Sequence, residues 1–169
     1  MLNPCVVVLA LLAGGGQAGA ADVLKPIDFL IGTWPAQGGG QPGQSAGTAV
    51  FTRAVQGHIV LRTSFADYPA TEGKPAARHD DLMVIYAAPG SGLRADYYDS
   101  EGHVIRYRVR VPAPGEAVFV SEPSAGEPGY RLTYKLSADD VLKGEFAIAS
   151  SDRPETFTTY LTWESRKTK

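Results

Sequence analysis

From Thr48 to Glu164 the sequence is a series of short segments in which polar and apolar residues alternate, separated by turns rich in glycine and proline. A period of two residues is typical of a β-strand with one buried face, and no long stretch after Leu30 has helical spacing. The pattern therefore predicts an all-β chain. The expected strands are Thr48–Arg53, His58–Ala66, Asp81–Ala88, Gly92–Tyr98, His103–Val111, Ala117–Glu122, Tyr130–Leu136, Val141–Ser150 and Thr156–Glu164, with a tenth around Trp34.

The turns between these segments are short. Pro89–Gly92, Asp99–Gly102 and Pro112–Gly115 have the composition of tight turns, which join neighbouring antiparallel strands. A meander of about ten strands without long crossovers favours a closed barrel, which also leaves no exposed strand edge. Ahead of the strands, Lys25–Gly32 begins near a proline and ends at a glycine, which predicts a short helical turn.

The N-terminal residues predict an export signal. An apolar run, Val6–Leu12, precedes the small residues Ala18–Ala20, so we expect a signal peptide over residues 1–20 and a single domain over 21–169. Neither this run nor any later segment reaches the roughly 18 apolar residues of a membrane-spanning helix. The sole cysteine, Cys5, lies in the segment to be removed, so no disulfide or thiolate metal site is expected. These features predict a bacterial periplasmic or secreted protein.

Composition limits the other classes of function. The net charge of −2 argues against nucleic-acid binding, which requires a basic surface. The segment Pro35–Gly47 is rich in glycine, proline, glutamine and serine and predicts a flexible loop. Nothing in the composition indicates an oligomeric state.

Three motifs carry a resemblance to a known family. The hexapeptide Phe29–Trp34, the strand containing Tyr86 and the hairpin Tyr97–His103 resemble those of exported bacterial calycin-like proteins of unknown function. The resemblance implies a lipocalin-like barrel with an interior ligand cavity and with Trp34 plugging one end. The chain is also weakly similar to nitrobindin-like barrels, which bind haem through a late histidine. The last histidine here is His103, so no haem, and no other cofactor, is expected.

The strand that begins at His103 has two faces of opposite character. One face carries an imidazole and apolar side chains, and the other carries arginines; which of them is interior decides whether the arginines form an outer ladder or bind an anionic headgroup. Aromatic residues on the apolar phase of other strands either line a ligand cavity or fill the barrel. The candidate ligand-binding residues are Tyr97, His103, Arg106, Arg108, Tyr107, Tyr134, Phe157 and Trp163.

The histidines His58, His79 and His103 do not have the spacing of a metal site, and none is predicted. The segment His79–Asp81 is interpreted as a loop whose carboxylates cap a turn, with cation binding as the alternative. No nucleophile motif or phosphate-binding loop is present in the sequence.

Three functions remain open. The first is a small-molecule binding protein that holds an apolar or amphipathic ligand in the barrel; a cavity of about 300 Å³ or more would favour it. The second is a structural or interaction protein of the cell envelope with a filled barrel. The third is a small hydrolase or isomerase that uses His103, Tyr107 and Arg106, or His79. A histidine bonded to a carboxylate inside a concavity would favour this third function.

Overall fold

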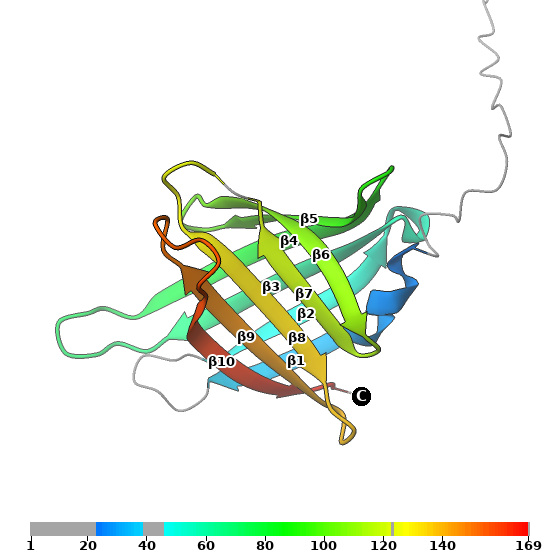
Figure 1. Ribbon diagram of the computed structural model, residues 1–169. Helices are drawn as coiled ribbons and strands as arrows, with labels where there is room; N and C mark the ends of the chain where they lie inside the picture. The colour runs from blue at the N-terminus through cyan, green and yellow to red at the C-terminus, as the bar shows by residue number, and fades with distance from the viewer. Residues whose placement is uncertain (1–22, 39–45, 123, 169) are drawn as a thin grey trace, which may run out of the picture.

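The computed structural model describes residues 23–38, 46–122 and 124–168. Ten antiparallel strands follow one another in chain order, and the first pairs with the last, which closes the sheet into a barrel (Figure 1). The predicted all-β meander barrel is confirmed. The strands are β1 (Gly32–Gly38), β2 (Ala46–Ala54), β3 (Ile59–Tyr68), β4 (Ala77–Ala88), β5 (Gly92–Asp99), β6 (Val104–Ala113), β7 (Glu116–Ser121), β8 (Gly129–Leu136), β9 (Val141–Ala149) and β10 (Thr158–Arg166).

Of two predicted loops, one lies wholly within a strand and the other is partly strand. β4 begins at Ala77, so His79–Asp81 lies inside a strand and does not cap a turn. The predicted loop Pro35–Gly47 is strand at both ends, because β1 continues to Gly38 and β2 begins at Ala46. Pairing of β1 with both β2 and β10 outweighs the low strand propensity of its glycine and proline. The rest of this loop, and the predicted signal peptide, lie outside the described residues.

Two of the tight turns depend on glycine. In the β4–β5 turn Gly90 has a φ of +71°, and in the β5–β6 turn Gly102 has a φ of +90°. Residues with a Cβ rarely adopt this left-handed region, so glycine is favoured at both positions. The β5–β6 turn is also bonded to the neighbouring strand, because the backbone N–H of Ser100 donates to the carbonyl oxygen of Asp80 at 2.9 Å. This attachment holds the turn in place at one end of the barrel.

The opposite end of the barrel is closed by the segment that leads into β1. A short 3-10 helix, η1 (Lys25–Leu30), buries Ile27 and Leu30 completely, and Trp34 in β1 is only 3% exposed. The indole Nε1 of Trp34 donates to the carbonyl oxygen of Leu30 at 2.6 Å. Arg53 of β2 anchors the helix through a 2.5 Å ion pair with Asp28. In the described residues, no helix has the length and apolar character needed to cross a membrane.

The middle of the barrel is filled by aromatic rings. Tyr134 makes edge-to-face contacts with Phe51, Phe119 and Trp163, at centroid distances of 5.6, 6.0 and 6.0 Å. Phe119 makes the same type of contact with Tyr107 at 6.2 Å. Such contacts stabilise a core beyond the effect of apolar burial alone. On one side of these rings the barrel interior is packed and is closed by Trp34. On the other side the interior opens beside the β5–β6 turn.

Candidate functional site: a cavity at the open end of the barrel

The open half of the barrel contains a cavity of about 460 Å³. Its lining is divided between two sides of the barrel. On β3 to β6, and on the β5–β6 turn, the lining is mostly polar or charged, whereas on β8 to β10 it is mostly apolar and aromatic. The polar side includes Arg62, Ser64, His79, Asp81, Tyr97, Asp99, Glu101 and His103, and the apolar side includes Tyr130, Leu132, Phe146, Leu161 and Trp163. A space with two unlike walls suits a molecule that has an apolar body and a polar edge.

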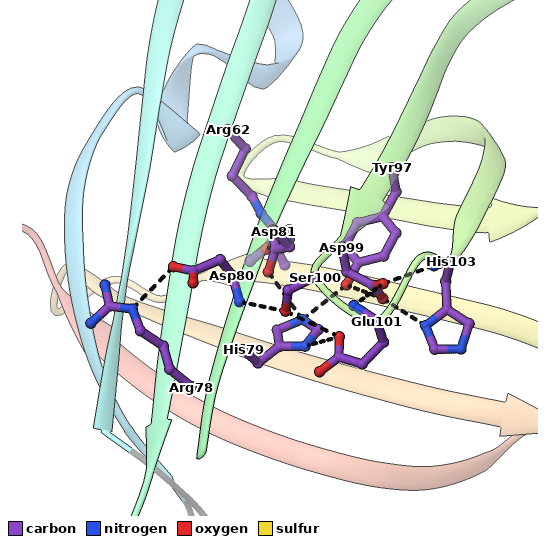
Figure 2. A network of polar contacts seen from close by, with 11 residues as sticks. Arg62, Arg78, His79, Asp80, Asp81, Tyr97, Asp99, Ser100, Glu101 and His103 are labelled. Atoms are coloured by element: carbon purple, nitrogen blue, oxygen red, sulfur yellow. Dashed lines mark hydrogen bonds and ion pairs between the residues drawn. The ribbon is translucent and has the colours of Figure 1, made fainter. Parts of the chain in front are cut away.

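A buried ion pair forms the inner part of the polar side. Arg62 is 6% exposed, and its Nη2 donates to the carboxylate of Asp81, whose side chain is equally buried. The second terminal nitrogen, Nη1, donates to the hydroxyl of Tyr134 at 2.7 Å. Figure 2 shows Arg62 reaching along the barrel interior toward Asp81. The pair joins neighbouring strands, since Arg62 lies on β3 and Asp81 on β4.

The charge of Arg62 is held by its surroundings. Burial disfavours the charged guanidinium, but Tyr134 and Asp81 more than offset this effect and raise the pKa of Arg62 above its ordinary value. Burial also raises the pKa values of the Tyr97, Tyr107 and Tyr134 hydroxyls, so all three stay neutral hydrogen-bonding groups. Within the described structure, Nε of Arg62 is buried with no hydrogen-bond partner.

His79 links the ion pair to the mouth of the cavity (Figure 2). Its Nδ1 lies 2.7 Å from Oε2 of Glu101 in the β5–β6 turn, and its Nε2 lies 3.1 Å from the hydroxyl of Tyr97. Nε2 is also 3.7 Å from Oδ2 of Asp81. The imidazole therefore lies between the buried pair and an exposed carboxylate, within hydrogen-bond distance of Glu101 and of the Tyr97 hydroxyl.

Asp99 organises the turn at the mouth. Its Oδ1 accepts bonds from the backbone N–H groups of Glu101 and His103, at 3.1 and 2.9 Å. Its Oδ2 lies 2.8 Å from Nδ1 of His103 and accepts a 3.3 Å bond from the hydroxyl of Tyr97. Burial alone would raise the pKa of Asp99, but the bonds from His103 and Tyr97 outweigh burial and lower it. Asp99 is therefore ionised at neutral pH.

We expect Asp99→Asn to destabilise the protein by about 1–3 kcal/mol at neutral pH, because hydrogen bonds to a charged acceptor are lost. The pKa of Asp99 is lower in the folded than in the unfolded state. Its contribution is therefore complete above the unfolded pKa and is lost as the pH falls through the folded pKa. Urea unfolding at a series of pH values should show the difference between wild type and variant shrinking below about pH 4. A difference that does not change with pH would contradict this role.

Five of the candidate ligand-binding residues line the cavity: Tyr97, His103, Tyr107, Tyr134 and Trp163. Arg106 and Arg108 do not. Both are exposed on β6, whereas Tyr107 and Val109 are buried, so the arginines lie on the outer face. The apolar residues of β6 point inward, because their burial stabilises the fold. The arginines between them point outward, where their guanidinium groups stay hydrated.

Phe157 is also outside the cavity lining, because β10 begins at Thr158 and Phe157 lies in the connection before it. The register of β10 against β9 also shifts between Thr159 and Leu161, which inserts one residue into the strand. One extra residue reverses the alternation, so a phase counted back from Trp163 does not extend to Phe157. The ring of Phe157 instead lies under the guanidinium of Arg131, and its centroid is 4.9 Å from Cζ of that arginine. No turn residue marks this bulge in the sequence.

The position of Trp163 depends on a glycine in the neighbouring strand. Trp163 pairs with Gly144 of β9, and a Cβ added at Gly144 would lie 2.0 Å from the indole ring. The indole therefore lies directly against the backbone of β9. This close approach keeps the largest ring of the apolar side against the barrel wall and leaves the cavity open.

Most residues of the polar side are not among the candidates that the sequence predicts. Arg62 lies on the same inward phase of β3 as the buried Val60, and Asp81 lies on the inward phase of β4 with the buried Met83. A charged residue on the apolar phase of a strand indicates a buried polar group, so the sequence pattern points to both residues. The sequence does not indicate that Glu101 belongs to the site, because only the attachment of its turn to β4 brings it close to His79.

The mouth also offers ligands for a metal. One atom each from His79, Asp99 and Glu101 lie within 4.8 Å of one another, so these residues could hold a divalent cation. All the carboxylate bonds of Asp99 described above would then compete with the metal. The arrangement thus provides proton-transfer groups, hydrogen-bonding groups and a negative mouth around one cavity.

No protein-family model matches this chain, and no curated protein matches it. The fold and the site define its class: a closed antiparallel ten-stranded β-barrel, plugged at one end and containing a cavity at the other.

Proposed function

We propose that this protein is an exported small-molecule binding protein that holds an amphipathic ligand in the open half of its barrel. The observation that carries the proposal is the 460 Å³ cavity with one polar and one aromatic side. This volume falls within the range of ligand sites in proteins, roughly 300–1,000 Å³. An apolar ligand body would lie against β8 to β10, and its polar group would face β3 to β6.

The cavity is formed by rigid elements, which favours binding without rearrangement. Tyr134 is anchored by Arg62 and by three aromatic neighbours, and Trp163 lies against Gly144. Side chains held in this way lose little conformational entropy when a ligand enters. A filled barrel, the basis of the structural-protein alternative, would have no such space.

Export and the family relationship are parts of the same proposal. Residues 1–20 have the composition of a signal peptide, and Phe29–Trp34 resembles the entry segment of calycin-like barrels. The closure of one barrel end by η1 and Trp34 is consistent with that resemblance. We infer a bacterial periplasmic or secreted location and a calycin-like ancestry on these grounds.

The proposal is tested by obstructing the cavity. Ser64 lines it, and Thr63, the residue before it in β3, is exposed on the opposite face. We expect wild-type protein purified from a bacterial periplasm to retain a small molecule that native mass spectrometry detects. Ser64→Phe should lose most of this molecule, because the added ring occupies the cavity, and the control Thr63→Phe should retain it. Equal retention by the two variants, or an empty wild-type protein, would contradict the proposal.

A second function is favoured by one observation. Two histidines at the mouth contact carboxylates inside a concavity, His79 with Glu101 at 2.7 Å and His103 with Asp99 at 2.8 Å. Such pairs can transfer protons to and from a bound molecule, as an isomerase or hydrolase requires. Conversion of the retained molecule by wild-type protein, abolished in His79→Gln, would establish this activity.

A further inference from the structure

The cavity lining contains more carboxylates than guanidinium groups. Among the described residues that line it, three are carboxylates, Asp81, Asp99 and Glu101, and one is a guanidinium, Arg62. The other two ionisable residues of basic type are His79 and His103, which carry no permanent charge. The permanent positive charge of the described lining is therefore one guanidinium, against three carboxylates.

Arg62 is not free to bind an anion. Its guanidinium is already paired with the carboxylate of Asp81 through Nη2 and bonded to Tyr134 through Nη1. An anionic ligand would either displace Asp81 from this buried ion pair or bring a second negative charge beside its carboxylate. Displacement would leave a buried carboxylate without its partner, which is strongly unfavourable.

The unbalanced carboxylates lie at the mouth. Asp99 has a side-chain exposure of 5% and Glu101 one of 49%, so one carboxylate lies inside the opening and the other on its edge. Within the described part of the chain, their ion-pair partners are His103 and His79, and neither is an arginine or a lysine. A positively charged group entering the cavity would meet two carboxylates whose charge is not permanently neutralised.

The aromatic side suits the apolar part of the same ligand. Tyr130, Phe146 and Trp163 border the cavity opposite the carboxylates, and Tyr130 stacks on Phe146 with centroids 5.9 Å apart. These rings bury apolar groups, so they suit the body of a molecule whose charged group faces the carboxylates.

We propose that the ligand of this cavity is an amphipathic organic cation: a protonated amine or quaternary ammonium group attached to an apolar body. Its charge lies near Asp99 and Glu101, and its apolar body lies against Phe146 and Trp163. This inference rests on the proposed binding function and names its ligand class. A divalent metal at His79, Asp99 and Glu101 would use the carboxylates but would gain nothing from the aromatic side.

Three probes with one apolar body separate charge from shape. Naphthylethylamine is a cation at neutral pH, naphthylethanol is neutral and naphthylacetate is an anion. In calorimetric titrations of wild-type protein with EDTA present, we expect the amine to bind about tenfold more tightly than the alcohol, and the anion to bind most weakly. EDTA removes any contribution from a metal ion held at the mouth.

Two variants test the position of the charge. Glu101→Gln should weaken amine binding several-fold and leave alcohol binding unchanged, because only the cation loses an electrostatic partner. Glu164→Gln is the control: Glu164 is an exposed residue of β10 that pairs with Lys143 and does not line the cavity. We expect it to leave the binding of all three probes unchanged.

The outcomes separate this inference from the proposed function. If the alcohol binds and the anion binds as tightly as the amine, the cation inference is wrong while the binding function stands. Equal effects of Glu101→Gln and Glu164→Gln on the amine would also overturn the inference. If none of the three probes binds to wild-type protein, both the inference and the proposed function are wrong.

Discussion

Replacing Arg62 by methionine is expected to destabilise the protein by about 3–5 kcal/mol, because it leaves the carboxylate of Asp81 buried without its partner. Both side chains are less than one tenth exposed, and Arg62 also donates to Tyr134. The variant loses this bond as well, which leaves the Tyr134 hydroxyl without a donor. Urea unfolding at neutral pH, followed by circular dichroism, measures the loss.

The double variant Arg62→Met with Asp81→Leu is the matched control. Replacing both members of a buried ion pair by apolar residues of similar size is often neutral, because no uncompensated charge remains. We expect the double variant to recover most of the stability that the single variant loses. A single variant as stable as wild type would show that the pair is more hydrated than its burial indicates.

Replacing Trp34 by alanine is expected to destabilise the protein by about 3–5 kcal/mol, the usual result of removing a large buried aromatic side chain. Trp34 is 3% exposed, and its indole N–H donates a hydrogen bond to the carbonyl oxygen of Leu30 in η1. The variant opens a cavity at the plugged end and leaves the carbonyl oxygen of Leu30 without the indole donor. Thermal and urea unfolding measure the effect.

The second tryptophan provides the comparison. Trp163 is half-buried and borders the cavity, so Trp163→Ala removes fewer packing contacts and should cost less stability than Trp34→Ala. It should instead weaken probe binding, since it removes the largest ring of the apolar side. If the two variants lose equal stability, Trp34 does not have the plugging role that its burial indicates.

The alternating pattern was sufficient to predict the nine strands from Thr48 onward, because a residue's phase depends only on its neighbours along the chain. It also identified Tyr97, Tyr107, Tyr134 and Trp163, which lie on inward phases and line the cavity. It failed for Phe157, which lies before β10, and a bulge within that strand interrupts the phase without any turn residue in the sequence. For His79–Asp81 the sequence predicted a loop, since polar residues at a strand end resemble a turn until the pairing partner is known.

The sequence by itself determined the all-β class and the order of the strands, because these follow from local alternation and turn chemistry. It left open which face of β6 points inward; the burial of Tyr107 and Val109 in the structure decided that the arginines lie outside. Only the tertiary structure decided that the barrel is half filled and half open, since a void depends on how rings from distant strands pack. It also decided the composition of the site. The antiparallel register places Ser64 opposite Asp81 and Asp81 opposite Asp99, which brings the polar residues of three strands to one side of one cavity.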